Sequence, residues 1–375
     1  MKVGFRWSSK NRYSIAVLSA VVDFEIVENP VEFKGDVLLY SFATAQSKQV
    51  YSEVKNLNGK YILIAGGPHP TARPVEVLNA GFDYAVLGEG EETLPELLRA
   101  IQTGSIHEVR GIAFKDRGEV IITQPRGQVD LDSYPPFSEK VLGPIEISRG
   151  CPHACKFCQT PRLFGKIMRH RSVEKIARYA SYYRDIRFIT PNAFAYGSNG
   201  LKLELEKIEA LLKLLKNMDK RIYFGTFPSE VRPEFVTSEA LELVKQYCAN
   251  DSLHIGGQSG SERILKEINR GHSVEDIINA VELCLEFEIV PVVDLLFGLP
   301  SETIEDQIAT LDLAKWICAK RGRIRVHYFK PLPSTPFEDQ KPVPLAREVR
   351  REIGRLALAG KIRGGFISSL DQVEG

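Results

Sequence analysis

Two successive series of alternating strands and helices run through this chain, and this alternation limits the possible folds more than any other feature. Apolar runs of strand length recur in the N-terminal part, and segments with helical periodicity separate them: strands at 3–7, 36–40, 61–65 and 83–87, helices at 13–22, 46–57, 75–80 and 91–102. Helices of this length between strands imply right-handed crossovers. The pattern therefore predicts an α/β domain with a doubly wound parallel sheet.

The pattern changes after residue 108. Residues 109–125 read as a hairpin around Asp116–Gly118, and a proline-broken connector follows at 131–137. A second series then has expected strands at 144–148, 186–190, 222–226, 252–256, 290–298 and 323–330. This series predicts a partial, open (β/α)6 barrel. We expect an N-terminal domain at 1–130 with 109–125 as a linker, a barrel at 136–340 and a helical extension at 341–375.

Composition narrows the class of protein. The 375 residues fit two domains, and 43% hydrophobic with 26% charged residues is a globular composition. Lys+Arg 49 against Asp+Glu 48 leaves a net charge of +1, which provides no general attraction to nucleic acid or anionic membrane. The N-terminus is too polar for a signal peptide, and no apolar run approaches the roughly 20 residues of a membrane span. We expect a soluble, cytoplasmic protein without a nucleic-acid partner.

Three of the six cysteines lie together directly after the first barrel strand. Cys151, Cys155 and Cys158 have the spacing C-x3-C-x2-C. Three thiolates can hold three irons of a cubane and leave the fourth iron open. Structural zinc usually takes four ligands from paired knuckles, and no second knuckle is present. The motif therefore predicts a [4Fe–4S] cluster, and Cys284 and Cys318, which lie in helical patterns, are expected to be buried thiols.

The barrel series with this motif resembles the radical S-adenosylmethionine (SAM) superfamily. The resemblance implies that SAM chelates the open iron and that its reductive cleavage yields a 5′-deoxyadenosyl radical. It also implies that SAM contacts come from the loop at Phe157 and from the strand ends, at Asn192, Ser229, Glu230, Gln258, Arg270 and Leu296. Asn192 stands where the family usually has Gly-Gly-Glu, and we expect it to supply an acceptor.

The N-terminal domain resembles the flavodoxin-like cobalamin-binding domain found in one subgroup of that superfamily. Ser41 and the pair Gly66-Gly67 match the serine and glycines that line the cofactor tail, which implies cobalamin as a further cofactor. The lower-axial histidine motif is missing, because residues 6–11 contain no histidine. His69 lies in a different loop.

The resemblance implies a cobalamin-dependent methyltransferase acting on an unactivated carbon. Its partners would be a small-molecule or unknown substrate and a flavodoxin- or ferredoxin-type electron donor. Alternatives are a cobalamin-independent radical rearrangement or cyclisation, a tRNA methylthiotransferase, and a cofactor carrier without catalysis. Methylthiotransferases carry a second cysteine triad in their N-terminal domain, whereas no cysteine precedes Cys151 here. They also end in an RNA-binding domain, for which the roughly 40 residues after Pro336 are too few.

Overall fold

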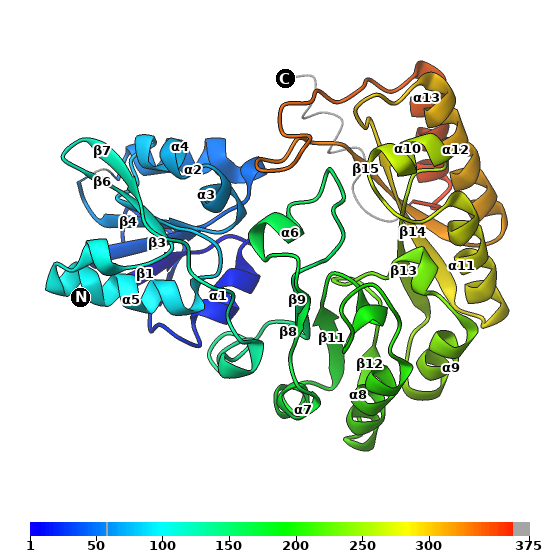
Figure 1. Ribbon diagram of the computed structural model, residues 1–375, viewed down its shortest axis with the longest axis horizontal. Coiled ribbons are helices and arrows are strands. Elements are labelled where there is room, and N and C mark those ends of the chain that lie inside the picture. The colour runs from blue at the N-terminus through cyan, green and yellow to red at the C-terminus, as the bar shows by residue number, and fades with distance from the viewer. Residues whose placement is uncertain (58, 363–375) are drawn as a thin grey trace. The chain divides into compact units, whose positions relative to one another are not determined.

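The computed structural model describes residues 1–57 and 59–362, which form two compact units (Figure 1). The first unit contains residues 1–144 together with 162–165, and the second contains 145–161 and the residues from 166 onward. The short helix α6 (Thr160–Leu163) crosses this division. The division places the change of unit at residue 144, just before the first barrel strand.

A seven-stranded sheet of order β2-β1-β3-β4-β5-β6-β7 forms the centre of the first unit. The first five strands in this order, β2, β1, β3, β4 and β5, are parallel to one another. β6 pairs antiparallel with β5, and β7 pairs antiparallel with β6. The strands are β1 (Val3–Arg6), β2 (Glu25–Val27), β3 (Val37–Ser41), β4 (Ile62–Gly66), β5 (Tyr84–Val86), β6 (Ile112–Asp116) and β7 (Glu119–Ile122). The predicted parallel sheet is therefore confirmed, and the 109–125 hairpin extends it. The sequence did not predict β2, a three-residue edge strand with two exposed residues.

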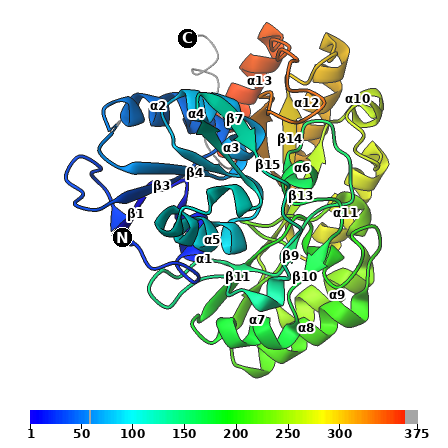
Figure 2. The same ribbon diagram turned by 60° about the vertical axis from the view of Figure 1, so that its left-hand side comes forward.

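Helices cover both faces of this sheet (Figure 2). Ile15 and Leu97 pack with Phe5 and Leu39 in one apolar core, and Val54 and Val77 share the second core with sheet residues of the opposite face. The helices are α1 (Arg12–Leu18), α2 (Ser47–Lys55), α3 (Pro68–Ala72), α4 (Pro74–Asn79) and α5 (Gly90–Thr103). Because β1 is flanked by β2 and β3, the crossovers reverse direction between β1 and β3. Ligands of doubly wound sheets bind beyond the strand ends at such a point.

The second unit contains the six predicted parallel strands of an open barrel. In the described residues they form two three-stranded groups, β12-β11-β8 and β13-β14-β15, and a parallel bridge between Val231 and Ile255 joins the two groups. The strands are β8 (Ile145–Glu146), β11 (Asp185–Ile189), β12 (Arg221–Tyr223), β13 (Ser252–Gln258), β14 (Val290–Phe297) and β15 (Arg323–Tyr328). A short antiparallel pair, β9 (Ser148–Arg149) with β10 (Arg169–His170), lies next to the first strand in sequence. In barrels of this kind, the chemistry takes place at the carboxyl ends of the parallel strands.

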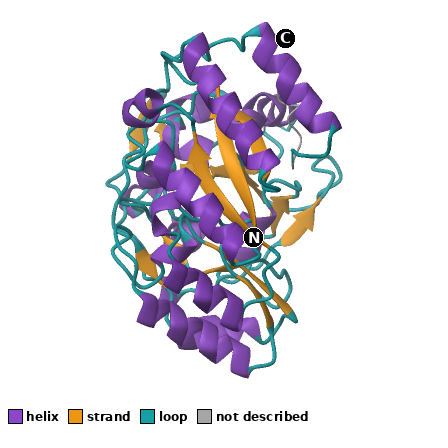
Figure 3. Ribbon diagram, turned by 90° about the vertical axis from the view of Figure 1, so that its right-hand side faces the viewer, coloured by secondary structure: helices purple, strands orange, loops and turns teal. Residues whose placement is uncertain are grey.

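Two long helices of this unit begin at capping boxes. Ser273 precedes α11 and Thr303 precedes α12, and each forms a capping box with the aspartate three residues later. α11 packs against β14, and α12 packs against β14 and β15. Figure 3 shows helices and strands in separate colours. The helices are α7 (Val173–Ala180), α8 (Leu205–Asn217), α9 (Ser238–Tyr247), α10 (Glu262–Glu267), α11 (Val274–Glu286), α12 (Ile304–Ala319) and α13 (Arg347–Leu358). Of the predicted extension, 363–375 lies outside the described residues.

Among the described residues, no helix combines the length and the apolar character that a membrane span requires.

We predict that Gly260 is required for the packing of α12. A Cβ atom at this position would lie 2.4 Å from the Ala309 carbonyl oxygen, so the helix backbone would have to move. Gly260→Ala should lower the free energy of unfolding by about 1–3 kcal/mol, as overpacking does. Gly354→Ala in α13 is the control, because nothing lies within 4 Å of the added Cβ. It should stabilise the helix by about 0.5–1 kcal/mol. Equal urea midpoints for the two variants would contradict the prediction.

Candidate functional site

The three clustered cysteines lie around one cavity of the second unit. Cys155 is buried, Cys151 and Cys158 are half-buried, and all three line a cavity of about 240 Å³. Burial and the neighbouring thiols raise the pKa of Cys151. Its thiolate form is therefore disfavoured unless a positive charge lies nearby. In the described residues no three His, Cys, Asp or Glu side chains converge as ligands of a single metal ion. A cubane does not require this, because each thiolate binds its own iron.

The cysteine loop is attached to the segment that follows α10. The Lys156 amide donates to the Ile268 carbonyl at 3.0 Å, and the Asn269 side chain donates to the Ala154 carbonyl at 3.3 Å. The Lys156 ammonium also pairs with Glu267 at 2.9 Å. Asn269 has a φ of 55°, a left-handed conformation that asparagine tolerates well. These contacts fix the backbone on both sides of Cys155.

The residues predicted to contact SAM gather at this cavity. Six of the seven line it together with the cysteines: Phe157, Asn192, Ser229, Glu230, Gln258 and Arg270. Leu296 lines an adjoining cavity of about 400 Å³. The two cavities share Phe157, Glu230 and Gln258, so they form adjacent parts of one site. The carboxyl ends of parallel strands bring these residues together from distant parts of the sequence.

Two donors on the cavity wall have no partner among the described residues. They are Asn192 Nδ2 and Arg270 Nε, both buried. The Asn192 amide oxygen already accepts from the Arg232 backbone amide at 3.4 Å. Asn192 therefore offers the cavity a donor through Nδ2, and because its oxygen has a second lone pair, the acceptor role expected from the sequence stays a prediction. Unsatisfied buried donors are costly, so a carboxylate on a ligand would compensate them.

Two acceptors on the same wall also lack hydrogen-bond partners in the described chain. They are Glu230 Oε2 and Asp294 Oδ1. Burial and the neighbouring charge of Asp294 raise the pKa of Glu230 to about 7, although Arg270 acts in the opposite direction. Arg325 lies 3.3 Å from the other oxygen of Asp294. The cavity thus offers both orphaned donors and orphaned acceptors to a ligand.

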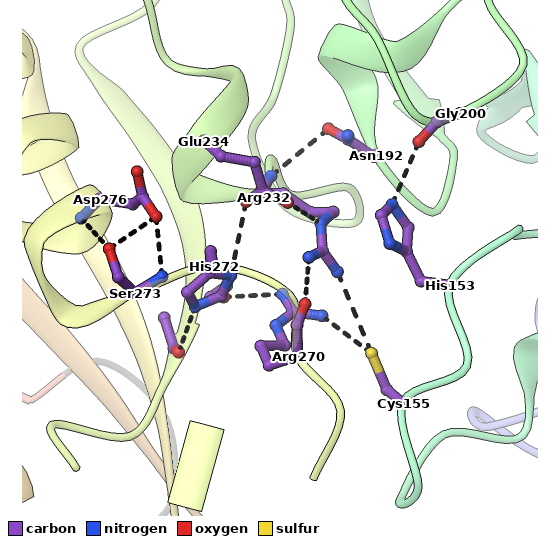
Figure 4. A network of polar contacts seen from close by, with 12 residues as sticks. His153, Cys155, Asn192, Gly200, Arg232, Glu234, Arg270, His272, Ser273 and Asp276 are labelled. Carbon is purple, nitrogen blue, oxygen red and sulfur yellow. Dashed lines mark hydrogen bonds and ion pairs between the residues drawn. The ribbon is translucent and has the colours of Figure 1, made fainter. Parts of the chain in front are cut away.

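Glu234, His272 and Gly256 belong to the site but carry no motif signal in the sequence. Glu234 accepts from the Arg232 guanidinium at 2.5 Å and lies 3.4 Å from His272 Nδ1 (Figure 4). Burial alone would raise the pKa of Glu234, but the contact with His272 and the charge of Arg232 lower it to about 2. A Cβ atom on Gly256 would lie 2.7 Å from Arg270 Nη2 and 3.1 Å from Glu230 Oε2. Only the tertiary contacts identify these three.

His153 lies between the cysteines in sequence. Its Nε2 lies 3.1 Å from the Gly200 carbonyl oxygen (Figure 4). Burial and the charge of Arg232 lower the pKa of His153 to about 4, so the ring is neutral at pH 7 and donates to that carbonyl. This contact gives His153 a role in holding the loop.

The residues predicted to bind cobalamin lie at the strand ends of the first unit. Ser41 ends β3, the strand next to β1 at the reversal point, and it is directly opposite Gly66 at the end of β4. The Ser41 hydroxyl donates to the Ser14 hydroxyl at 2.9 Å, and it keeps lone pairs that can accept from a ligand. The three residues are therefore adjacent, as the sequence predicts.

Gly66 and Gly67 differ in what a side chain at each position would meet. Gly67 has a φ of +95°, and a Cβ atom there would lie 2.8 Å from Ser41 Oγ. At Gly66, an added Cβ would make ordinary van der Waals contacts, 3.9 Å from the Tyr40 carbonyl oxygen and from Val86 Cβ. His69 is buried, with Nε2 bonded to Tyr51 at 2.8 Å and Nδ1 to Thr44 at 3.1 Å. A glycine beside a serine lets a ligand approach the backbone closely.

Comparison with known proteins agrees with this division into two units. The family model described as the radical SAM superfamily matches residues 145–314, and the model described as a B12 binding domain matches residues 10–98. These ranges contain the cysteine loop and the Ser41/Gly66 strand ends respectively.

Curated relatives are distant. An uncharacterized methyltransferase of Pyrococcus horikoshii is 27% identical over 309 residues, covering 76% of this chain and 65% of its own length. A tRNA-2-methylthio-N(6)-dimethylallyladenosine synthase of Rickettsia rickettsii is 33% identical over 208 residues, covering 51% of this chain and 44% of its own length. The chain thus spans less than two thirds of the length of both.

Two solved structures share the fold across nearly the whole chain. TsrM, a radical SAM methyltransferase from Kitasatospora setae solved with cobalamin and a [4Fe–4S] cluster, has a TM-score of 0.69 at 17% identity and covers 90% of this chain and 74% of its own. OxsB, a cobalamin-dependent SAM radical enzyme, has a TM-score of 0.66 at 18% identity and covers 96% and 55%. The family models thus identify a B12 binding domain at residues 10–98 followed by a radical SAM domain at residues 145–314, and the two solved structures share the fold of this chain.

Proposed function

We propose that this protein is a cobalamin-dependent radical SAM methyltransferase that methylates an unactivated carbon. One observation carries the proposal: the cavity beside Cys151, Cys155 and Cys158 has orphaned donors and orphaned acceptors on one wall. SAM carries the complementary groups, a carboxylate that accepts and an ammonium and ribose hydroxyls that donate. Asn192 and Arg270 would hold the carboxylate, and Glu230 and Asp294 would hold the donors.

The remaining predicted contacts complete the site. Phe157 and Leu296 line the adjoining cavity and would contact the adenine, while Ser229 and Gln258 would add polar groups from the wall of the cysteine-lined cavity. Arg270 is buried and positively charged beside Cys155, which favours both thiolate and carboxylate at this place. A cluster bound here supplies the electron that cleaves SAM to the 5′-deoxyadenosyl radical.

The first unit would hold cobalamin at Ser41, Gly66 and Gly67. Cobalamin bound there supplies the methyl group that is transferred. The loop after β1 offers no imidazole, because it contains no histidine. Its Asn11 side chain donates to the Arg6 carbonyl and accepts from the Ser8 amide. We infer a cofactor without a histidine ligand, a small-molecule substrate and a flavodoxin- or ferredoxin-type donor of the electron.

A tRNA methylthiotransferase activity is the second candidate, because one such synthase shares 33% identity over 208 residues. The first unit argues for the methyltransferase instead. It contains no cysteine that could hold a second cluster, and its Ser41/Gly66 strand ends lie within the segment that matches the B12 binding domain.

The first test concerns the cluster. Anaerobically reconstituted protein should hold about four irons and four sulfides and form 5′-deoxyadenosine from SAM. Replacing Cys151, Cys155 or Cys158 by Ala should abolish both. Cys284→Ala is the matched control, because this thiol is buried in α11 and its loss should leave the iron content unchanged. Stoichiometric zinc without iron would refute the cluster.

The second test uses the pKa of Glu230, which burial raises to about 7. SAM donors favour the ionised carboxylate, so SAM affinity should rise as the pH increases from about 6 to about 8, by at most about tenfold per unit. Glu230→Gln should bind more weakly and lose this dependence. Burial also raises the pKa of Glu302 to about 7, but Glu302 lines neither cavity, so Glu302→Gln should keep the wild-type profile. Calorimetric titration measures all three, and equal pH profiles would count against the assignment of Glu230.

The third test concerns cobalamin and methyl transfer. The protein should bind hydroxocobalamin with a spectrum that lacks a histidine-ligand signature. Gly66→Val should block binding, because a branched side chain beside Ser41 would occupy the place proposed for the cofactor tail, whereas Gly127→Val, where nothing lies within 4 Å of an added Cβ, should not. Turnover should form both S-adenosylhomocysteine and 5′-deoxyadenosine. Formation of 5′-deoxyadenosine alone, with no cobalamin retained, would favour the cobalamin-independent reactions.

A further inference from the structure

Two guanidinium groups point at the sulfur of a single cysteine. Arg270 Nη1 lies 3.5 Å from Cys155 Sγ, and Arg232 Nη1 lies 4.0 Å from the same atom (Figure 4). Both arginines are buried, with 8% and 4% of their surface exposed. Arginine cannot deprotonate in a protein, so both positive charges are permanent and are weakly screened by water.

Arg232 is held in place by two contacts besides the one to Cys155. Its Nε donates to Glu234 at 2.5 Å, and its Nη2 donates to the Arg270 carbonyl. Glu234 in turn lies 3.4 Å from His272 Nδ1, and His272 Nε2 lies 3.0 Å from the Gly257 carbonyl on β13. A chain of polar contacts therefore runs from a barrel strand to the cysteine sulfur.

The charges along this chain do not cancel equally. Glu234 compensates Arg232 directly, since the two side chains are paired and lie two residues apart. Arg270 instead donates through Nη2 to the Gly256 carbonyl at 2.7 Å, a neutral acceptor. Lys156 in the cysteine loop is paired with Glu267. Cys155 consequently faces two cations: Arg232 has Glu234 as a direct ion-pair partner, whereas Arg270 is attracted by Glu230 and Glu234 without a direct ion pair among the described residues.

We propose that the Arg232–Glu234 pair sets the reduction potential of the cluster through the Cys155 sulfur. This inference rests on the proposed function, because it requires a cluster on the three cysteines. Reduction adds one electron to the cluster, supplied by an external one-electron carrier, and no bond forms or breaks. Hydrogen bonds and positive charge near the sulfurs stabilise the more negative, reduced state and so raise the potential.

Arg232 and Glu234 act here as positioning residues with opposite signs. Removing the Arg232 charge withdraws stabilisation from the reduced cluster, so the potential falls. Removing the Glu234 charge leaves Arg232 uncompensated, so the potential rises. A purely structural role predicts something different, because a loosened loop would shift both variants in the same direction.

The test is a mediated redox titration with dithionite, followed by the electron paramagnetic resonance signal of the reduced cluster, without SAM. Arg232→Met should shift the midpoint to lower potential and Glu234→Gln to higher potential. The double variant should lie between them, near the wild type. Arg232→Lys keeps the charge and should shift less than Arg232→Met. Lys156→Met removes a charge on a side chain that is 36% exposed, where water screens it, so it should shift the midpoint less than either single variant.

The outcomes separate this inference from the proposed function. Shifts of the two single variants in the same direction, or no shift in either, would overturn the inference while the cluster itself stands. If Arg232→Met fails to hold a cluster, Glu234→Gln decides alone, and an unchanged or lower midpoint in that variant refutes the inference. Wild-type protein without an iron–sulfur cluster would instead refute the proposed function.

Discussion

Charges that are buried must be compensated, and this requirement organises the second unit around Cys155. Arg232 and Arg270 stay ionised in the interior, where an isolated charge costs several kcal/mol, so each needs partners. Glu234 pairs with Arg232, Glu230 attracts Arg270, and two backbone carbonyls accept from the guanidinium groups. Both guanidinium groups also point at the cysteine sulfur. Three thiolates and a ligand carboxylate are the anionic groups that these two positive charges can stabilise.

The same requirement explains why the cavity suits a ligand of mixed charge. Burial and the neighbouring charge of Asp294 both raise the pKa of Glu230, so a positively charged group would be welcome beside this carboxyl. Buried donors and acceptors without partners line the same cavity. A zwitterionic ligand would satisfy both kinds of group.

The first unit meets a different constraint, that of space. Its strand order reverses direction at β1 and β3, and Ser41 and Gly66 lie at the neighbouring strand ends. Gly67 is needed for its left-handed conformation beside Ser41, whereas an added Cβ at Gly66 would make only ordinary van der Waals contacts. Under the proposed function, the first glycine would shape the backbone and the second would let a cofactor approach it.

Strand and helix periodicity by itself predicted the N-terminal sheet and the barrel strands, because the spacing of apolar residues is a local property of the sequence. The three cysteines could also be recognised from the sequence, since their ligand spacing lies within one loop. The edge strand β2 could not, because three largely exposed residues carry no apolar pattern. Neither could the roles of Glu234, His272 and Gly256, because only the tertiary structure brings Glu234 against Arg232 and His272, and Gly256 against Arg270. The surroundings of Asn192 were decided in the same way: the Arg232 amide donates to its oxygen, and its buried nitrogen has no partner among the described residues. Compensation of buried charge depends on distances between residues that are far apart in the chain, and only the tertiary structure sets those distances.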